Sequence, residues 1–263
     1  KDADVLLLQT PPAAATWVET FLGRFRLAGD FQFERAADCA AFTIQGHAAA
    51  GLLGGAIGAS LDDGRSLTLR VVDVEDAAVR IAGSPRSIAG GFDVVGPVQT
   101  VRAIAERLLG SVADPVQIAT DAELDVLRME AGLPAFQIDF DADAVLQEID
   151  QPDIVSFHKG CYVGQEIVAR IHFQGKPGKL LRRLELPDGQ VPVRGDEILS
   201  PSDGNHAGTV TSVATSSTLG PIVFAMIKRR YYEAGTRVVV RHDGHDLPAT
   251  VVERTPAAVA GEA

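Results

Sequence analysis

The last third of the chain is a series of short strand-like segments separated by turn residues, and this pattern limits the fold more than any other feature. It follows a strong break at residues 175–178, Gly-Lys-Pro-Gly. Turn residues such as Pro187-Asp188-Gly189 and Asp203-Gly204-Asn205 then separate the segments. Five or six short strands at this spacing predict a small antiparallel β-barrel over residues 176–254. The expected strands are Lys179–Glu185, Glu197–Leu199, Ala207–Ala214, Ile222–Lys228, Arg237–Val240 and Ala249–Val252.

The first 120 residues alternate between strand-like and helical patterns. A helix is expected over Ala13–Phe25, where Trp17, Phe21 and Leu22 have helical spacing. Strand, helix, strand, strand is half of a ferredoxin-like split βαβ unit, and a similar pattern recurs further along. We therefore expect residues 1–120 to form one ferredoxin-like α+β domain. The other expected elements are the strands Val5–Gln9, Phe31–Arg35, Cys39–Gln45, Ser66–Val74, Ala77–Ala82 and Gly91–Val95, and the helix Gln99–Leu109.

Residues 121–175 differ from the first 120 residues in that strand-like patterns give way to short helices and irregular segments. A short helix over Ala122–Ala131 should end at Gly132, because Pro134 follows shortly after. The acidic stretch 135–158 is mostly irregular, with a short helix expected near residues 142–149, and Gln165–Arg170 could begin another helix. The resulting division is a domain at 1–120, a central segment at 121–175, the barrel at 176–254 and a disordered tail at 255–263.

Composition excludes several classes of protein. A net charge of −11 disfavours a nucleic-acid coat or a binder of anionic membranes. The two cysteines, Cys39 and Cys161, form no disulfide framework and cannot alone build a zinc or iron–sulfur site, so a cytoplasmic protein is expected. The longest small-apolar run, Ala48–Ala59, is too short to span a bilayer. Because the chain starts at Lys1 and enters a strand at once, we expect an N-terminal part to be missing.

Residues 158–166, His-Lys-Gly-Cys-Tyr-Val-Gly-Gln-Glu, form the segment that most resembles a functional site; we call it the signature segment. Glycines on either side of Cys161 let the backbone turn tightly or approach a ligand. A nearby cation such as Lys159 favours a thiolate over a thiol. Cys161 is therefore a candidate for redox chemistry, metal handling or nucleophilic attack, and the alternative is a small buried hydrophobic residue. Cys39, in an apolar strand, is predicted to lie in the core.

The signature segment resembles that of the YgfZ-type folate-binding proteins, which are relatives of the glycine-cleavage T-protein, an aminomethyltransferase. The resemblance extends to Arg128-x-Glu130-x-Gly132, to Ser156-Phe157, to Val168-Ala169-Arg170 and to the Gly-Thr-Val-Thr-Ser run at 208–212. It covers most of the chain from about residue 120 and is weaker before that. It implies ferredoxin-like domains around a central folate cavity, followed by a C-terminal β-barrel. It also implies about a hundred residues before this chain, including the region of the T-protein's catalytic aspartate.

The resemblance implies that Glu130 grips the pterin ring of tetrahydrofolate. A pterin presents a 2-amino group beside a ring N–H, and a carboxylate can accept both hydrogen bonds. The alternative is a surface glutamate on a helix. Arg128 could orient the carboxylate of Glu130, or could simply be solvated.

For the other residues of the signature region, the sequence allows either a ligand-binding role or a structural role. Tyr162 could stack on a ligand ring or fill a core gap, and Gln165 and Glu166 could contact ligand or cap the following helix. Lys159 and Arg170 would suit the carboxylates of a polyglutamylated folate tail. The basic stretch containing them is either an electrostatic pocket or a solvated face beside a basic strand; it is made up of Lys159, Arg170, Lys176, Lys179, Arg182 and Arg183. His242 and His245 lack metal-ligand spacing and are expected to be exposed.

The resemblance implies a tetrahydrofolate-binding accessory protein for iron–sulfur cluster assembly or repair, in which Cys161 and Lys159 carry the chemistry. Its expected partners are folate and iron–sulfur client or assembly proteins. No membrane is expected, and tRNA is expected only indirectly, because the basic stretch lacks interleaved aromatic residues. The alternative is a folate-dependent one-carbon transferase of the aminomethyltransferase type. Whether the protein is an enzyme is left open.

Overall fold

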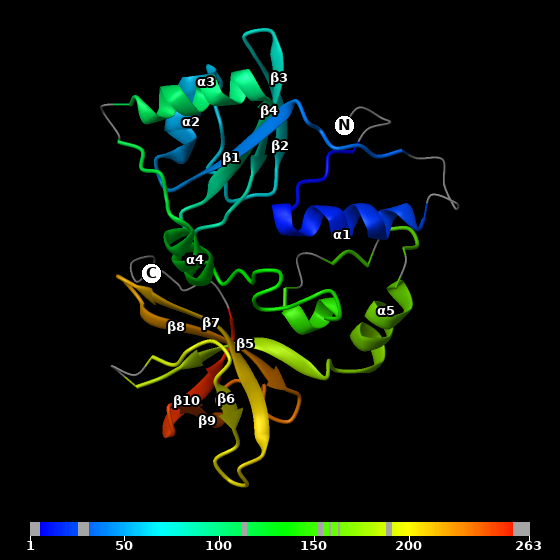
Figure 1. Ribbon diagram of the computed structural model, residues 1–263, viewed down its shortest axis with the longest axis vertical. Helices are drawn as coiled ribbons and strands as arrows, with labels where there is room; N and C mark the ends of the chain where they lie inside the picture. The colour runs from blue at the N-terminus through cyan, green and yellow to red at the C-terminus, as the bar shows by residue number, and fades with distance from the viewer. Residues whose placement is uncertain are drawn as a thin grey trace. The chain divides into compact units, whose positions relative to one another are not determined.

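In a computed structural model the chain divides into two compact units, Lys1–Cys39 and Ala40–Ala263, whose elements are labelled in Figure 1. Because this division falls inside the predicted first domain, we describe each unit by itself. The domain boundaries drawn from the sequence stay predictions. The structure describes residues 6–25, 32–111, 115–151, 155–157, 159–162, 164–187 and 191–254, so the predicted tail at 255–263 lies outside it.

The first unit contains helix α1 (Pro12–Gly23), which confirms the predicted helix. Glu19 of α1 forms an ion pair with Arg35, with 2.6 Å between Oε1 and Nε. The strands predicted at Val5–Gln9 and Phe31–Arg35 are wrong, because the described residues of both lie outside any strand. Short apolar runs become strands only where a neighbour offers a hydrogen-bonding edge. The side chain of Arg35 binds helix α1 instead.

A four-stranded sheet in the order β1-β4-β3-β2 forms the first part of the second unit. Alternate residues of β3, such as Val79 and Ile81, are buried against Ile104 of helix α3 and Leu53 of helix α2. This confirms the α+β character expected for the region. The elements are β1 (Cys39–Gln45), α2 (Ala49–Ile57), β2 (Leu69–Val74), β3 (Ala77–Gly83), β4 (Gly91–Pro97) and α3 (Val98–Leu109).

Helix α2 was not expected from the sequence. It contains Gly51, Gly54 and Gly55, and glycine is a poor helix former. Burial of Leu53 and Ile57 in the core offsets that weakness. Gly54 is needed sterically, because a Cβ there would lie 2.7 Å from the carbonyl oxygen of Ala59, in the turn that ends the helix.

Helix α4 (Asp121–Glu130) begins and ends at recognisable signals. At its start, Thr120 Oγ1 accepts a hydrogen bond from Glu123 N, while Thr120 N donates to Glu123 Oε2, forming a capping box. At its end, Leu133 N donates to Arg128 O at 2.8 Å around Gly132, whose φ is +70°. The predicted stop at Gly132 is confirmed. Glu130 therefore lies in the last turn of a helix whose two ends are both fixed.

Two further helices follow α4. The short 3-10 helix η2 (Leu146–Ile149) occupies part of the region where a short helix was expected. Helix α5 (Gln165–Gln174) begins at the predicted residue and runs one turn further than expected. Its N-cap residue Gly164 has a φ of +88°, a conformation that favours glycine.

The C-terminal strands close into an antiparallel barrel in the order β10-β5-β8-β7-β6-β9. Its interior is filled by alternate residues, including Leu184, Val223, Ala225 and Ile227. The predicted barrel is confirmed, and two of its strands have the predicted bounds. The strands are β5 (Lys179–Glu185), β6 (Glu197–Leu199), β7 (His206–Ser216), β8 (Gly220–Lys228), β9 (Arg237–His242) and β10 (His245–Val252).

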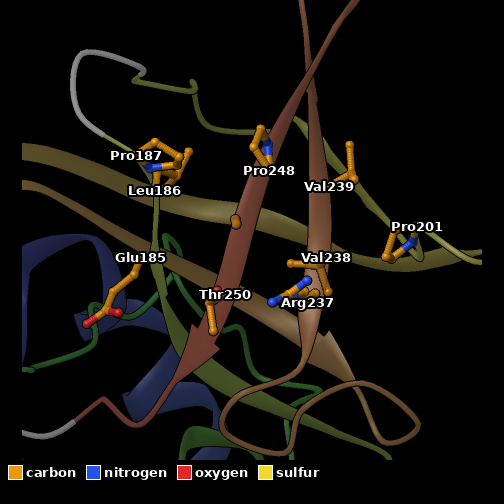
Figure 2. Close-up of a pocket in the computed structure, with 10 residues that line it drawn as sticks. Glu185, Leu186, Pro187, Pro201, Arg237, Val238, Val239, Pro248 and Thr250 are labelled. Carbon is orange, nitrogen blue, oxygen red and sulfur yellow. The ribbon is translucent and has the colours of Figure 1, made fainter.

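A hollow of about 430 Å³ is lined in part by residues of β5, β9 and β10 (Figure 2). Among the described residues, β10 pairs with β5 over residues 250–252, whereas its first half pairs with β9. The hollow lies beside that first half and is lined in part by Leu186, Pro187 and Pro248. Proline lacks an N–H, which suits Pro248 to a strand edge without a partner.

Helix α4 packs on the outer face of the barrel. Met129 is buried together with Leu181 of β5 and with Ile222 and Phe224 of β8. Strand β5 therefore buries both of its faces, because Leu180 and Leu184 belong to the barrel interior and Leu181 lies under the helix. This packing fixes where the last turn of α4 lies on the barrel.

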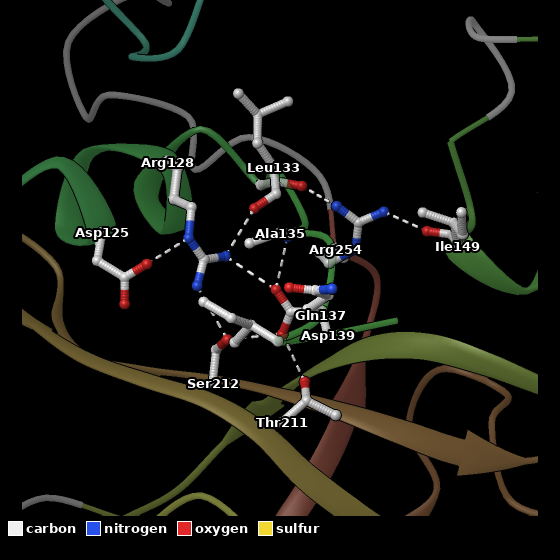
Figure 3. Close-up of polar contacts among 12 residues, drawn as sticks. Asp125, Arg128, Leu133, Ala135, Gln137, Asp139, Ile149, Thr211, Ser212 and Arg254 are labelled. Carbon is white, nitrogen blue, oxygen red and sulfur yellow. Dashed lines mark hydrogen bonds and ion pairs between the residues drawn. The ribbon is translucent and has the colours of Figure 1, made fainter. Parts of the chain in front are cut away.

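A buried carboxylate, Asp139, joins α4 to the barrel (Figure 3). It accepts hydrogen bonds from Arg128 Nη1 at 2.9 Å and from Ala135 N at 2.8 Å. It also accepts from the hydroxyls of Thr211 and Ser212, both at 2.6 Å. Successive strand residues normally face opposite ways, but the register of β7 shifts between Val210 and Ser212. This β-bulge lets both hydroxyls reach one carboxylate.

A second buried cation, Arg254, follows β10. Its guanidinium donates to the carbonyl oxygens of Gly132, Ile149 and Asp150. Burial lowers the pKa of Arg254 below its ordinary value, while the carboxylates of Asp150 and Asp139 oppose that shift. Arginine remains charged near neutral pH because its ordinary pKa is so high. Arg254 thus ties the end of α4 and the end of η2 to the last barrel strand.

None of the helices in the described ranges has the length and apolar character needed to cross a bilayer.

We predict that Asp139→Asn lowers the free energy of unfolding by about 3 kcal/mol, the order expected when a buried ion pair loses one charge. All four partners of Asp139 are donors, and an amide would turn one of its own N–H groups toward them. Chemical denaturation measures the change. Asp141→Asn is the control, because Asp141 is exposed and should change stability by less than about 0.5 kcal/mol. Equal stability of the two variants would contradict the role of Asp139.

Candidate functional site

Glu130 has one oxygen bound to the barrel and one oxygen free. Its carboxylate Oε1 accepts a hydrogen bond from Ser216 Oγ of β7 at 2.5 Å. Within the described part of the chain the other oxygen, Oε2, has no hydrogen-bonding partner. The side chain is partly exposed at the end of α4. Glu130 is therefore an oriented carboxylate that keeps acceptor capacity, unlike a freely solvated surface glutamate.

From the sequence, Arg128 was expected either to orient the carboxylate of Glu130 or to be solvated, and the structure shows neither. Its guanidinium donates to Asp125, to Asp139, to Leu133 O and to Ser212 Oγ, and its side chain is 13% exposed. It neither bonds Glu130 nor is solvated. Arg128 fixes the helix that carries Glu130, so its effect on any ligand would be indirect.

The chain just before and within the signature segment contacts α5 at two points. At one end the ring of Phe157, two residues before Lys159, stacks on His172 with 3.9 Å between ring centroids. At the other end Tyr162 N donates to Gln165 Oε1 at 3.2 Å. Gln165 thus bonds the chain that precedes α5, and its side chain does not cap the helix. His158 and Val163 lie outside the described residues.

The thiol of Cys161 is exposed between these two attachments. The ammonium of Lys159 lies 4.6 Å from the ring centroid of Tyr162, a cation–π contact within the segment. Lys159 itself is exposed, and so are Glu166 and Arg170 on α5. Tyr162 is partly buried. The alternative reading of Cys161 as a buried hydrophobic residue is therefore wrong.

The candidate residues lie in two parts of the structure. One contains Glu130 and Arg128 on α4, and the other contains Lys159, Cys161, Tyr162, Gln165 and Arg170 along α5. In the ranges that the structure describes, no hydrogen bond, ion pair or ring contact joins the two groups. Neither group lines the hollow of Figure 2 or a smaller one of about 230 Å³ beside Asp139.

The basic stretch is not one positive surface. Lys176 pairs with Glu233 at 2.8 Å, Lys179 lies 3.8 Å from Glu148, and Arg182 pairs with Asp150. The hydrogen bond with Glu233 raises the pKa of Lys176 above its ordinary value. These acidic partners neutralise much of the positive charge of the stretch. The stretch is therefore better described as a solvated face beside a basic strand than as an electrostatic pocket. Lys159, two residues before Cys161, and Arg170 on α5 remain exposed cations.

Two smaller predictions need correction. Cys39 is exposed and not in the core, because it lies at the very start of β1. His242 is partly buried, with its Nδ1 2.8 Å from Asp196 Oδ2, although His245 is exposed as expected. No cluster of three or more potential metal-binding side chains occurs among the residues that could be described.

Sequence reasoning missed Asp139, Ser216 and Arg254. Asp139 is an acid between two aromatic residues, Phe136 and Phe140, which is a weak sign of a buried carboxylate. Ser216 belongs to a run of small hydroxyl residues that reads as a turn, and Arg254 follows the last strand like any surface arginine. Their roles depend on contacts with residues 72 to 122 positions away, which local pattern does not reveal.

Residues 179–256 match the family model of the glycine cleavage T-protein C-terminal barrel domain. The chain is 29% identical over 148 residues to the tRNA-modifying protein YgfZ of Serratia proteamaculans, a match that covers 55% of this chain and 44% of the relative. It is 27% identical over 224 residues to an aminomethyltransferase of Herpetosiphon aurantiacus, covering 85% of this chain and 60% of the relative. The chain thus spans about half the length of the curated relatives it matches.

A solved structure shows the same fold. The glycine cleavage system aminomethyltransferase T from Bartonella henselae superposes with a TM-score of 0.75 at 24% identity, over 92% of this chain and 67% of that chain. Together with the closed six-stranded barrel, these similarities confirm an α+β, T-protein-like fold with a C-terminal barrel. The chain is thus similar to YgfZ-type proteins and to aminomethyltransferases, and its C-terminal barrel matches the glycine cleavage T-protein barrel domain.

Proposed function

We propose that the protein binds tetrahydrofolate and serves the assembly or repair of iron–sulfur clusters, with Cys161 as its functional thiol. The observation that carries the proposal is the exposed Cys161 thiol in a segment attached at both ends of α5. Exposed cysteines beside cations are typical of reactive sites, whereas structural cysteines are buried. The cluster is the cargo of this reaction and not a resident metal.

The residues around Glu130 fit a pterin. A half-exposed carboxylate with Oε2 free can accept the paired N–H donors of the ring, and Ser216 already fixes the direction of that carboxylate. Arg128 supports the helix end without using the acceptor capacity of Glu130. Tetrahydrofolate, when bound, would supply a nitrogen, N5, that can carry a one-carbon unit.

The groups along α5 suit the rest of the ligand and the cargo. Arg170 and Lys159 are exposed cations that would attract the carboxylates of a folate tail, including a polyglutamylated one. Tyr162, already held by Lys159, offers an aromatic face. Gln165 positions the backbone of Tyr162. An iron–sulfur client or assembly protein in the cytoplasm is the proposed partner, and tRNA would be affected only through such a client.

An aminomethyltransferase-like activity is the second candidate. It is favoured by the match to the Herpetosiphon aminomethyltransferase along 85% of this chain. In that case an acidic residue activates the folate N5 and a one-carbon unit moves to it. The Lys-Gly-Cys-Tyr run favours the first function, because T-proteins lack it. An assay of aminomethyl transfer to tetrahydrofolate distinguishes the two.

We predict that Cys161→Ser abolishes the support of iron–sulfur enzyme activity while leaving the free energy of unfolding within about 0.5 kcal/mol, because the side chain is exposed. The readouts are the activity of an iron–sulfur enzyme in cells carrying the variant as the sole copy, and chemical denaturation. Cys39→Ser is the matched control, since it removes the other exposed thiol. A fully active Cys161→Ser variant would exclude the thiol from function.

We predict that Glu130→Ala weakens tetrahydrofolate binding by about 1.5–3 kcal/mol, the contribution of a hydrogen bond to a charged group. Isothermal titration calorimetry under anaerobic, reducing conditions measures the loss. Glu106→Ala on helix α3, where the side chain is exposed, serves as the control and should bind like the unmodified protein. Unchanged affinity in Glu130→Ala would mean that the pterin binds elsewhere.

A further inference from the structure

Ser216, at the end of β7, makes the contact that orients Glu130. Its side chain is buried, and its hydroxyl oxygen lies 2.5 Å from Glu130 Oε1. The two residues are 86 positions apart in the sequence. A buried serine that binds a half-exposed carboxylate is not needed to end the helix, because the turn at Gly132 already closes α4.

The direction of this hydrogen bond is set by the hairpin that follows Ser216. Its hydroxyl oxygen accepts hydrogen bonds from Thr218 N at 3.1 Å and from Leu219 N at 3.0 Å. A hydroxyl has one proton and two acceptor positions, so the proton of Ser216 goes either to Glu130 Oε1 at 2.5 Å or to Thr218 Oγ1 at 3.1 Å. The shorter contact with the charged carboxylate is the stronger one, which directs the proton to Glu130. The two backbone N–H groups also polarise the hydroxyl, which strengthens it as a donor.

Both partners are held by the barrel. Ser216 pairs with Gly220 in the β7–β8 ladder, and Gly220 has a φ of +69° that forms the turn. Leu219 of that turn packs against the cluster that contains Met129, the residue before Glu130. The hydroxyl and the carboxylate are thus fixed relative to one another before any ligand binds.

We propose that Ser216 is a positioning residue that makes Glu130 selective for a ring with an amino group beside a ring N–H. By holding Oε1, it leaves Oε2 and the remaining acceptor capacity of Oε1 directed at two adjacent donors. Without Ser216 the carboxylate rotates freely and recognises a single donor almost as well as a pair. This inference rests on the proposed binding of folate by Glu130.

The test compares two ligands, tetrahydrofolate and its 2-desamino-2-methyl analogue, which lacks one of the two donors. Calorimetry on the intact protein gives the affinity for each ligand. The affinity for tetrahydrofolate divided by that for the analogue is a ratio that measures recognition of the amino group. Ser216→Ala should lower this ratio by roughly five- to tenfold, the order that one hydrogen bond contributes. Ser216→Thr retains a hydroxyl and should keep the ratio. Ser216→Cys, with a weak donor of similar size, should lower it and serves if the alanine variant does not fold.

Ser200→Ala is the matched control. Ser200, which follows β6, is also a buried serine, but its hydroxyl contacts Ser202, so its loss should leave the ratio unchanged. If Ser216→Ala and Ser216→Cys weaken both ligands equally while Glu130→Gln lowers the ratio, Ser216 is only structural and the positioning role is overturned. If Glu130→Gln also keeps the full ratio, the pterin site itself is misplaced, and the proposed function fails with it.

Discussion

The ion pair between Arg128 and Asp139 is the constraint on which the placement of the candidate site depends. Asp139 is fully buried, and its four hydrogen bonds come from α4, from the loop after it and from two hydroxyls of β7. Such a pair need not add stability relative to a hydrophobic core, but its directional bonds allow one arrangement. Helix α4 therefore meets the barrel in one register, which brings Glu130 to the hydroxyl of Ser216. Arg254 strengthens the same junction from the last strand.

The two candidate groups, the Glu130 carboxylate and the Cys161 thiol, are held in the structure in different ways. Glu130 is attached to rigid elements, with a buried neighbour and a hydrogen bond to the barrel, as precise recognition of a ring requires. Cys161 is exposed on a segment attached to one helix at its two ends, as transfer to another molecule requires. A rigid binding group and an accessible thiol agree with a protein that binds a cofactor and serves a partner.

The sequence predicted the barrel well because alternating strands and turn residues are local signals. It also predicted the stop of α4 at Gly132. It failed where long-range packing overrides local preference, as in the glycine-rich helix α2, and where a strand lacked a partner, as near Arg35. For the candidate site, resemblance and composition proposed Glu130 and Cys161. The roles of Arg128 and Ser216 required the structure, because their partners are distant in sequence or depend on the bulge in β7.

A calorimetric titration of the intact protein with tetrahydrofolate, under anaerobic and reducing conditions, tests the central claim most directly. The account predicts saturable binding at one site per protein. Absence of binding at millimolar tetrahydrofolate would contradict it: the fold would stand, but Glu130 would no longer be a ligand for a pterin, and the segment around Cys161 would have to be explained as a docking surface for a protein partner.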